Sequence, residues 1–449
     1  MKMEQDFTRG AIFGPLLRFA LPVLAAGFLQ MLYGAVDLMI VGWYCSPADI
    51  AAVSTGSGVM FSLTIAVAGL SLGTTVLLGQ KFGEGLTDEL GPIVDASVCL
   101  FGTLGAAIAV LMQPLAPYAA KALLTPAEAF AGTVTYVRLC CAGFPFIVAY
   151  NLLGGIFRGL GNASLPMLAV AVACVANIAG DWLLIGACGM GTAGAAIATV
   201  AAQAGSVLFS LLLIRRRGVP FSFGRRDVRF HRSLITRVLK LGGPVAFQDV
   251  IVNFSFLVIA AIVNSLGVVT AAGIGIAERV CGFIMLAPSA FGQAMSTFAA
   301  QNTGAGQPER ARRGLLCAIL ASLAAGCVMG WLSFFHGDAL TGLFVEDQPE
   351  LVRIGWEYLR AYSIDCLLTS FLFCFIGYFS GLGKTSFVMW QGIIGAFCVR
   401  IPVSWAMSRL VPVSVFRIGL ATPLSTVVQI ALCLVAFARL KNETALNER

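Results

Sequence analysis

The sequence predicts an all-α protein that crosses a membrane about twelve times. Hydrophobic residues make up 58% of its 449 residues and charged residues only 11%, whereas about 25% of a typical soluble domain is charged. The mean hydropathy is +0.89. Apolar stretches of the roughly 20 residues that a helix needs to cross a bilayer recur along the whole chain.

Twelve apolar segments are separated by short polar or Gly- and Pro-containing breaks. The first run of hydrophobic residues is too long for the core of a signal peptide, so we expect it to be the first spanning helix. The first six segments cover about 15–43, 51–80, 90–112, 132–157, 164–187 and 191–214. The second six cover about 238–265, 270–300, 312–335, 352–380, 386–410 and 417–439.

Basic residues fall mainly in alternate loops, which predicts the topology. With the N-terminus in the cytoplasm, nearly all Lys and Arg lie on the cytoplasmic side, as the positive-inside rule requires. We therefore expect a multi-pass protein of the cytoplasmic (inner) membrane with both termini inside. The net charge of +7 is better explained by this topology, and by contact with anionic lipid heads, than by nucleic-acid binding.

The chain divides into two similar halves around a basic linker. We expect an N-terminal six-helix lobe at 1–214, a cytoplasmic linker at 215–237 and a C-terminal six-helix lobe at 238–449. Three motifs recur at an offset of 221 or 222 residues: Pro22 and Pro244, 79–83 and 300–304, and 157–161 and 379–383. Because each half has an even number of helices, the halves are expected to be related by an axis along the membrane normal.

The first segment carries one carboxylate, Asp37, which is a functional candidate by its position. A charge within hydrocarbon is costly unless it meets a cation, a proton donor or a wet cavity. Gln30 and Tyr33 precede Asp37 by seven and four residues and share its helical face. We take Gln30, Tyr33 and Asn151 as candidates for a substrate cavity. The alternative is an Asp that is close enough to the outer surface to be solvated, or that is held by a neighbouring helix end.

Three further polar residues lie at the same predicted depth as Asp37. Asn177 and Asp181 are four apart on the fifth segment, and Thr199 is on the sixth. Asp37, Asp181 and Thr199 all come roughly 10 Å below the outer surface at 1.5 Å per residue. Oxygen ligands suit a hard cation such as Na⁺, and two neighbouring carboxylates in a low dielectric also favour one shared proton. A purely structural polar network between helices is the alternative.

Three motifs give the chain a family resemblance. They are Gln80–Gly85, its counterpart Gln301–Gly306, and Arg158–Pro166, which reads RGLGNASLP. With these motifs and its duplicated halves, the chain resembles the multidrug and toxic compound extrusion family from about residue 10 to 440. The resemblance implies a V-shaped, twelve-helix antiporter that exports organic compounds using inward flow of Na⁺ or H⁺.

Within that family the chain is similar to the DNA-damage-inducible branch. That branch places an Asp on the first helix, an Asn and an Asp four apart on the fifth and a Thr on the sixth, which this sequence matches with Asp37, Asn177, Asp181 and Thr199. The resemblance implies that they form the coupling site. The second-half carboxylates of another branch are not reproduced, since Asp365 is expected near the outer start of the tenth helix.

Other charges within the second-half segments are expected to form ion pairs between helices, with substrate contact as the alternative. They are Asp249, Glu278, Arg279 and Arg400. A further three charged residues are expected near helix ends, where they reach water and carry no chemistry. They are Arg138, Arg360 and Asp365.

No enzyme site is expected from the sequence. Residues 381–386 resemble a phosphate-binding loop, but Tyr378 stands where that motif requires Gly. His231 and His336 are far apart and cannot form a catalytic pair. We expect no cofactor beyond the coupling ion H⁺ or Na⁺, no metal other than Na⁺ at the coupling site, and a monomer whose partners are small organic molecules and membrane lipids.

The predicted function is cation-coupled export of organic, cationic or neutral amphipathic compounds by alternating access. The alternative is a flippase for a lipid-linked precursor, which would need a cationic cavity to hold a pyrophosphate. Asp37 and Asp181 favour cationic or neutral cargo, whereas Arg279 and Arg400 leave the flippase open.

Overall fold

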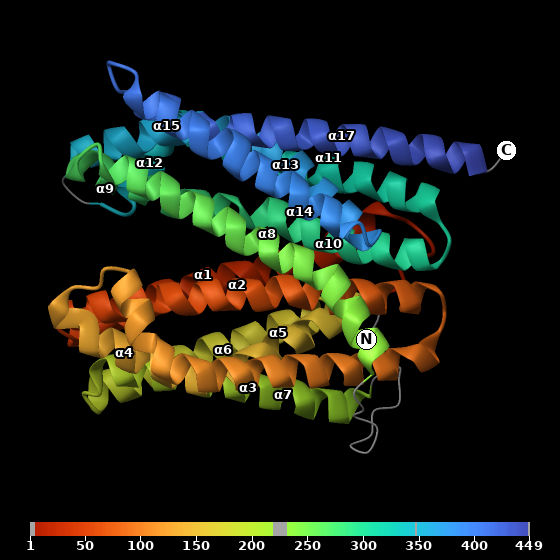
Figure 1. The fold of residues 1–449 in the computed structure, drawn as a ribbon, viewed down its shortest axis with the longest axis horizontal. Coiled ribbons are helices and arrows are strands. Elements are labelled where there is room, and N and C mark those ends of the chain that lie inside the picture. Colours follow the sequence, from red (N-terminus) through yellow and green to blue (C-terminus); the bar gives the residue numbers. More distant parts are fainter. Residues whose placement is uncertain (1–4, 219–230, 346–347, 448–449) are drawn as a thin grey trace. The chain divides into compact units, whose positions relative to one another are not determined.

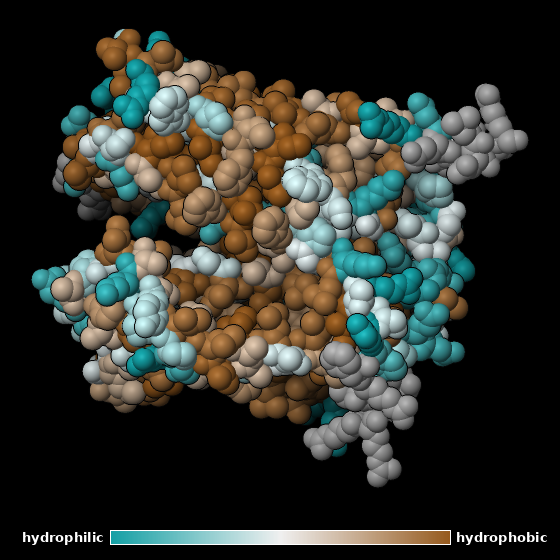
Figure 2. All heavy atoms as spheres, in the orientation of Figure 1, coloured by the Kyte–Doolittle hydropathy of each residue, from teal (hydrophilic) through white to brown (hydrophobic). Residues whose placement is uncertain are grey.

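The computed structural model describes residues 5–218, 231–345 and 348–447, and within these ranges it contains helices and no strands (Figure 1). Eleven helices in the described ranges are long and apolar enough to cross a membrane, or twelve if one bent pair counts as a single span. Hydrophobic side chains cover the middle lengths of the helices and hydrophilic ones gather near their ends (Figure 2). The predicted fold class is confirmed.

The first-half helices lie close to the predicted segments. They are α1 Phe13–Tyr44, α2 Pro47–Gly83, η1 Thr87–Glu89, α3 Leu90–Ala122, α4 Ala127–Ala142, α5 Phe144–Gly159, α6 Ser164–Asp181, η2 Trp182–Ala187 and α7 Gly191–Arg217.

The second-half helices follow the same order. They are α8 Arg232–Asn264, α9 Val268–Ile284, α10 Leu286–Gly304, α11 Pro308–Phe335, α12 Gly337–Gly342, α13 Pro349–Gly381, α14 Thr385–Ile393, η3 Ile394–Arg400, α15 Ile401–Arg409, α16 Val415–Gly419 and α17 Ala421–Asn447.

Local sequence explains where α2 begins. The Ser46 hydroxyl accepts a hydrogen bond from the Asp49 backbone N–H, and Asp49 Oδ2 accepts one from the Ser46 N–H, both at 3.2 Å. This reciprocal arrangement is a capping box, which satisfies two backbone donors that a helix start leaves open. Pro47 follows at the first position of the helix, where its missing N–H has no cost.

Three of the predicted spans contain a bend or an irregular segment in the structure. The fourth, expected as one helix, is the pair α4 and α5, bent by 53°. Gly143 lies at the bend, where the side chain of Val200 leaves no room for a Cβ atom. The fifth and eleventh spans contain π-helical segments, η2 directly after Asp181 and η3 ending at Arg400. Such segments change the direction in which the following side chains point, and they are frequent at functional sites.

The chain forms two compact units. The first contains 1–9, 21–246 and 304–306, and the second contains 10–20, 247–303 and 307–449. Each has its own apolar core, with Val137 among the buried residues of the first and Leu359 among those of the second. The division passes through α1, between Ala20 and Leu21. Residues 219–230 of the predicted linker lie outside the described residues, and its described ends belong to α7 and α8.

Candidate functional site

The carboxyl groups of Asp37 and Asp181 meet inside the first unit. Asp37 on α1 is 8% exposed and Asp181 at the end of α6 is 0% exposed. Both carboxylate oxygens of Asp181 and Oδ1 of Asp37 are buried without a hydrogen-bond partner among the described residues. The two carboxyls lie within hydrogen-bonding reach of each other. Two charged carboxylates are both acceptors, so this contact becomes a hydrogen bond only when one of them holds a proton.

Asn177, one helical turn before Asp181 on α6, is also buried without hydrogen-bond partners among the described residues. It is 2% exposed, and neither its amide nitrogen nor its amide oxygen has a partner in the described parts of the chain. Beside it, α6 packs closely on α7, since a Cβ atom at Gly180 would lie 3.0 Å from the Ala198 Cβ. Glycine at this position therefore allows the two helices to pack closely next to Asp181 at the end of α6.

A cavity of about 470 Å³ opens next to Asp37. Five of the predicted site and cavity residues line it, from α1, α5 and α7. They are Gln30, Tyr33, Asp37, Asn151 and Thr199. Asn177 and Asp181 are not in its lining, so Asp37 is the residue that belongs both to the cavity wall and to the buried carboxyl pair. Among the described residues that line the cavity, Asp37 is the only charged one.

Several other polar side chains of the lining have partners of their own, whereas the Gln203 amide oxygen is buried without one among the described residues. The Gln30 amide donates to the Tyr150 hydroxyl at 3.3 Å, and the Asn151 amide donates to the Ile147 carbonyl at 2.8 Å. The Thr199 hydroxyl donates to the Ala195 carbonyl at 3.0 Å. The Thr199 oxygen keeps free lone pairs, because a hydroxyl accepts as well as donates.

Sequence reasoning missed Tyr136 on α4, which also lines the cavity. Its hydroxyl accepts a hydrogen bond from Ser57 at 3.3 Å and lies beside Thr199. Its ring fits against α2 because residue 56 is glycine, where a Cβ atom would come 2.5 Å from Tyr136 Cδ1. The available signal was an aromatic residue with a hydroxyl group inside a predicted spanning segment, but the direction in which its side chain points depends on the packing of α2 against α4.

The second-half charges differ from expectation. Asp249, Glu278, Arg279 and Arg400 form no ion pair within 4.0 Å in the ranges that the structure describes. Arg400 is 6% exposed, donates to the Ser255 hydroxyl at 3.3 Å and lies 4.5 Å from the centre of the Phe256 ring. The expected ion pairs are therefore not formed among the described residues, and Arg400 at the end of η3 instead contacts α8 through a hydroxyl and a ring.

Asp365 was also misplaced by the sequence. It stands 16 residues after the start of α13, or about 24 Å along the helix axis, and is 1% exposed. The prediction of a position near the helix end is therefore wrong. Asp365 is the carboxylate that interacts electrostatically with Arg400, without direct contact, and Thr426 of α17 lies beside it.

The first-unit geometry suits a small cation or a proton. Carboxylate, amide and hydroxyl oxygens are the ligands of hard cations, and buried polar groups without partners are rare in folded proteins. Asp37, Asn177, Asp181 and Thr199 are the residues that could hold such an ion.

Known proteins resemble this chain over almost its full length. Probable multidrug resistance protein YoeA of Bacillus subtilis (strain 168) is 25% identical over 447 residues, which cover 96% of this chain and 94% of that protein. Multidrug export protein MepA of Staphylococcus aureus (strain MSSA476) is 23% identical, with 91% of each chain covered.

Solved structures share the fold. A multidrug resistance MATE family transporter of the MOP superfamily, in an outward-facing conformation, superposes with a TM-score of 0.91 at 21% identity, covering 98% of this chain and 99% of that chain. A MOP superfamily transporter from Pyrococcus furiosus, described as having a binding pocket of reverse polarity, gives 0.91 at 21% identity, with 97% of each chain covered.

The sequence profile of the MatE family matches residues 22–183 and again residues 244–406. The two matches cover most of the chain and fall one in each half, as the internal repeat does. The chain therefore belongs to the MatE family.

Proposed function

We propose that this protein is a cation-coupled antiporter that exports organic cations or neutral amphipathic compounds across the cytoplasmic membrane. The observation that carries the proposal is that Asp37 both lines the cavity and contacts Asp181. The names of the relatives, which describe multidrug resistance and export, support the class of cargo.

Coupling follows from competition for the same negative charge. An inward-moving H⁺ or Na⁺ that binds between Asp37 and Asp181 neutralises the carboxyl group that faces the cavity. A cationic compound in the cavity then loses its electrostatic partner and is released. Ion and cargo thus favour different states of the same site, which is the thermodynamic condition for exchange.

Helix α1 is the element best placed to respond to the ion. In the most apolar stretch of α1 only 11% of the residues are buried, whereas in that of α2 the share is 56%. Pro22 lies one residue from the point where α1 passes between the two units. A proline within a helix removes one backbone hydrogen bond and permits a bend. We propose that neutralisation of Asp37 changes the bend of α1 at Pro22.

The alternative function, a flippase for a lipid-linked precursor, requires a cationic cavity. Among the described residues, the cavity next to Asp37 is lined by one carboxylate and by no Lys or Arg. A structural neighbour described as having a pocket of reverse polarity indicates that this fold accommodates either sign. The charge of the lining is therefore the feature that favours cationic or neutral cargo here.

The test is efflux of a fluorescent organic cation from proteoliposomes, driven by a pH gradient alone and then by a Na⁺ gradient alone. The wild type is expected to respond to at least one gradient, which identifies the ion. Asp181→Asn should lose this response, while Asp88→Asn, an exposed carboxylate on η1, should keep it. Undiminished efflux by folded Asp181→Asn protein, or no efflux by the wild type under either gradient, contradicts the proposal.

A further inference from the structure

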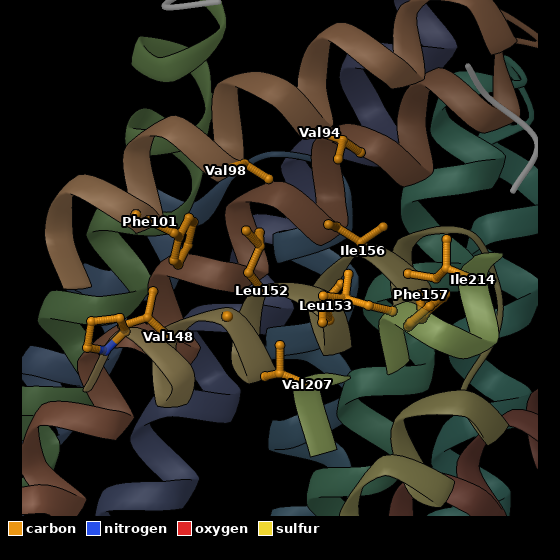
Figure 3. A pocket seen from close by; sticks show the side chains of 14 residues that line it. Val94, Val98, Phe101, Val148, Leu152, Leu153, Ile156, Phe157, Val207 and Ile214 are labelled. Atoms are coloured by element: carbon orange, nitrogen blue, oxygen red, sulfur yellow. The ribbon is translucent and has the colours of Figure 1, made fainter. Parts of the chain in front are cut away.

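A second hollow on the first unit is separate from the Asp37 cavity. It lies between α3, α5 and α7 and has a volume of about 300 Å³ (Figure 3). Every residue that lines it is apolar or glycine. Phe101, Leu152 and Ile156 form its buried floor, whereas Gly102 and Leu211 on its rim are exposed. The hollow is therefore an apolar groove on the side of a membrane-spanning bundle.

The groove is elongated along the helices. In Figure 3, Val94 and Ile214 lie at one end and Phe101 and Val148 at the other. On α3 the lining runs from Val94 to Gly102, which is about 12 Å at 1.5 Å per residue. This shape fits an extended chain better than a compact molecule.

Two arginine residues lie next to one end of the groove. Ile214 is the last residue of α7 that lines it, and the next two residues, Arg215 and Arg216, are exposed. Guanidinium groups next to a membrane surface attract anionic lipid heads. An apolar groove with arginines at its mouth matches an anionic phospholipid in both its parts.

We propose that this groove holds one acyl chain of an anionic glycerophospholipid whose phosphate contacts Arg215 and Arg216. An empty groove would forfeit the dispersion contacts of its lining, and water gains no hydrogen bonds there. The lining offers no polar group to orient a drug, whereas the Asp37 cavity does. The two linings share no residue.

The lipid would support the helix that separates the two hollows. Val148, Leu152 and Ile156 of α5 face the groove, while Tyr150 and Asn151 of the same helix face the Asp37 cavity. An acyl chain against one face of α5 therefore fixes the position of the other face.

The test uses the full-length protein reconstituted in vesicles of phosphatidylglycerol that carries a photoreactive acyl chain. Crosslinks are expected within 94–102, 145–157 and 207–214, and native mass spectrometry is expected to find one retained phosphatidylglycerol. Gly102→Leu should fill the groove and abolish both signals, because a Cβ atom at Gly102 meets nothing within 4 Å. Gly205→Leu on α7 is the matched control, since its Cβ position is equally open, and it should keep both signals.

Arg215→Gln/Arg216→Gln tests the headgroup separately. Wild-type protein should prefer phosphatidylglycerol to phosphatidylcholine, and this preference should fall on the order of tenfold in the double variant. Retained lipid in folded Gly102→Leu, wild-type crosslinks elsewhere in the chain, or no retained lipid in the wild type overturns the proposal. Equal wild-type binding of the two lipids overturns it as well. Efflux is not measured, so these outcomes are independent of the antiport proposal.

Discussion

Asp37 and Asp181 place two carboxyl groups in contact within the first unit, and the structure provides neither with a basic partner among its described residues. Two negative charges this close in a low dielectric repel each other strongly, so the pair favours binding one positive charge. Because only Asp37 also faces the cavity, the two residues should differ in what their loss changes.

Asp37→Asn and Asp181→Asn are therefore expected to have separable effects. Asp37→Asn removes the one charged group of the described cavity lining and should weaken binding of an organic cation roughly tenfold, or about 1.4 kcal/mol. Asp181→Asn should leave that binding near the wild-type value and remove its dependence on the coupling ion. Fluorescence titration of the purified variants measures both. Equal loss of affinity in the two variants would contradict the division of roles.

The binding of organic cations should depend on pH with a defined sign. Protonation of the pair removes negative charge from the cavity wall, so affinity for a permanently charged organic cation should fall as the pH falls. Affinity for a neutral cargo should change little, because it does not depend on that charge. Titrations at a series of pH values test this, and Asp37→Asn is expected to flatten the profile. An affinity for the cation that rises in acid would refute the competition mechanism.

Gly56 should be intolerant of a side chain. A Cβ atom there would lie 2.5 Å from Tyr136 Cδ1, so Gly56→Ala should displace the Tyr136 ring and cost about 1–3 kcal/mol of stability through overpacking. Gly58, two residues away, has nothing within 4 Å of its Cβ position. Gly58→Ala should be neutral or stabilising by up to about 1 kcal/mol, because alanine is the better helix former. Thermal unfolding in detergent compares the two, and equal unfolding temperatures would contradict the packing argument.

The sequence contained enough to locate the centre of the candidate site. Asp37 and Asp181 were expected together because both are polar residues at one depth of apolar helices, and depth follows from counting residues at 1.5 Å each. The same count could have placed Asp365 in the middle of α13. The prediction for Asp365 is wrong because the depth of a residue depends on where its helix begins and ends, and α13 extends over Pro349–Gly381.

Lateral contacts could not be predicted from periodicity. The position of Tyr136 depends on Gly56 of another helix, and Arg400, which contacts Ser255, is the last residue of a π-helical segment. Hydrophobic periodicity describes the faces of a regular helix, and it is uninformative where one extra residue per turn rotates the following side chains. The bend between α4 and α5, by contrast, has a signal in the sequence, because Pro145 in the first turn of α5 cannot donate the backbone hydrogen bond that would continue α4.

Arg400 and Asp365 should be energetically coupled although they form no direct ion pair. Each is buried in the second unit, and the two opposite charges interact electrostatically. Arg400→Met leaves the Asp365 charge buried without a cation, which is costly. Adding Asp365→Asn removes that charge and should recover part of the loss. A double-mutant cycle on unfolding free energies is expected to give a coupling of about 0.5–3 kcal/mol.

The matched control for this cycle is Arg409→Met. Arg409 ends α15, is exposed and also lies near an aromatic ring, 5.7 Å from the centre of Trp405. It therefore reproduces the loss of a guanidinium and of a ring contact without the buried electrostatic partner. Combined with Asp365→Asn, it should be additive within about 0.5 kcal/mol, as distant sites are. If the Arg400 cycle is equally additive, solvent or some other group compensates these buried charges and the assigned relationship between them is incorrect.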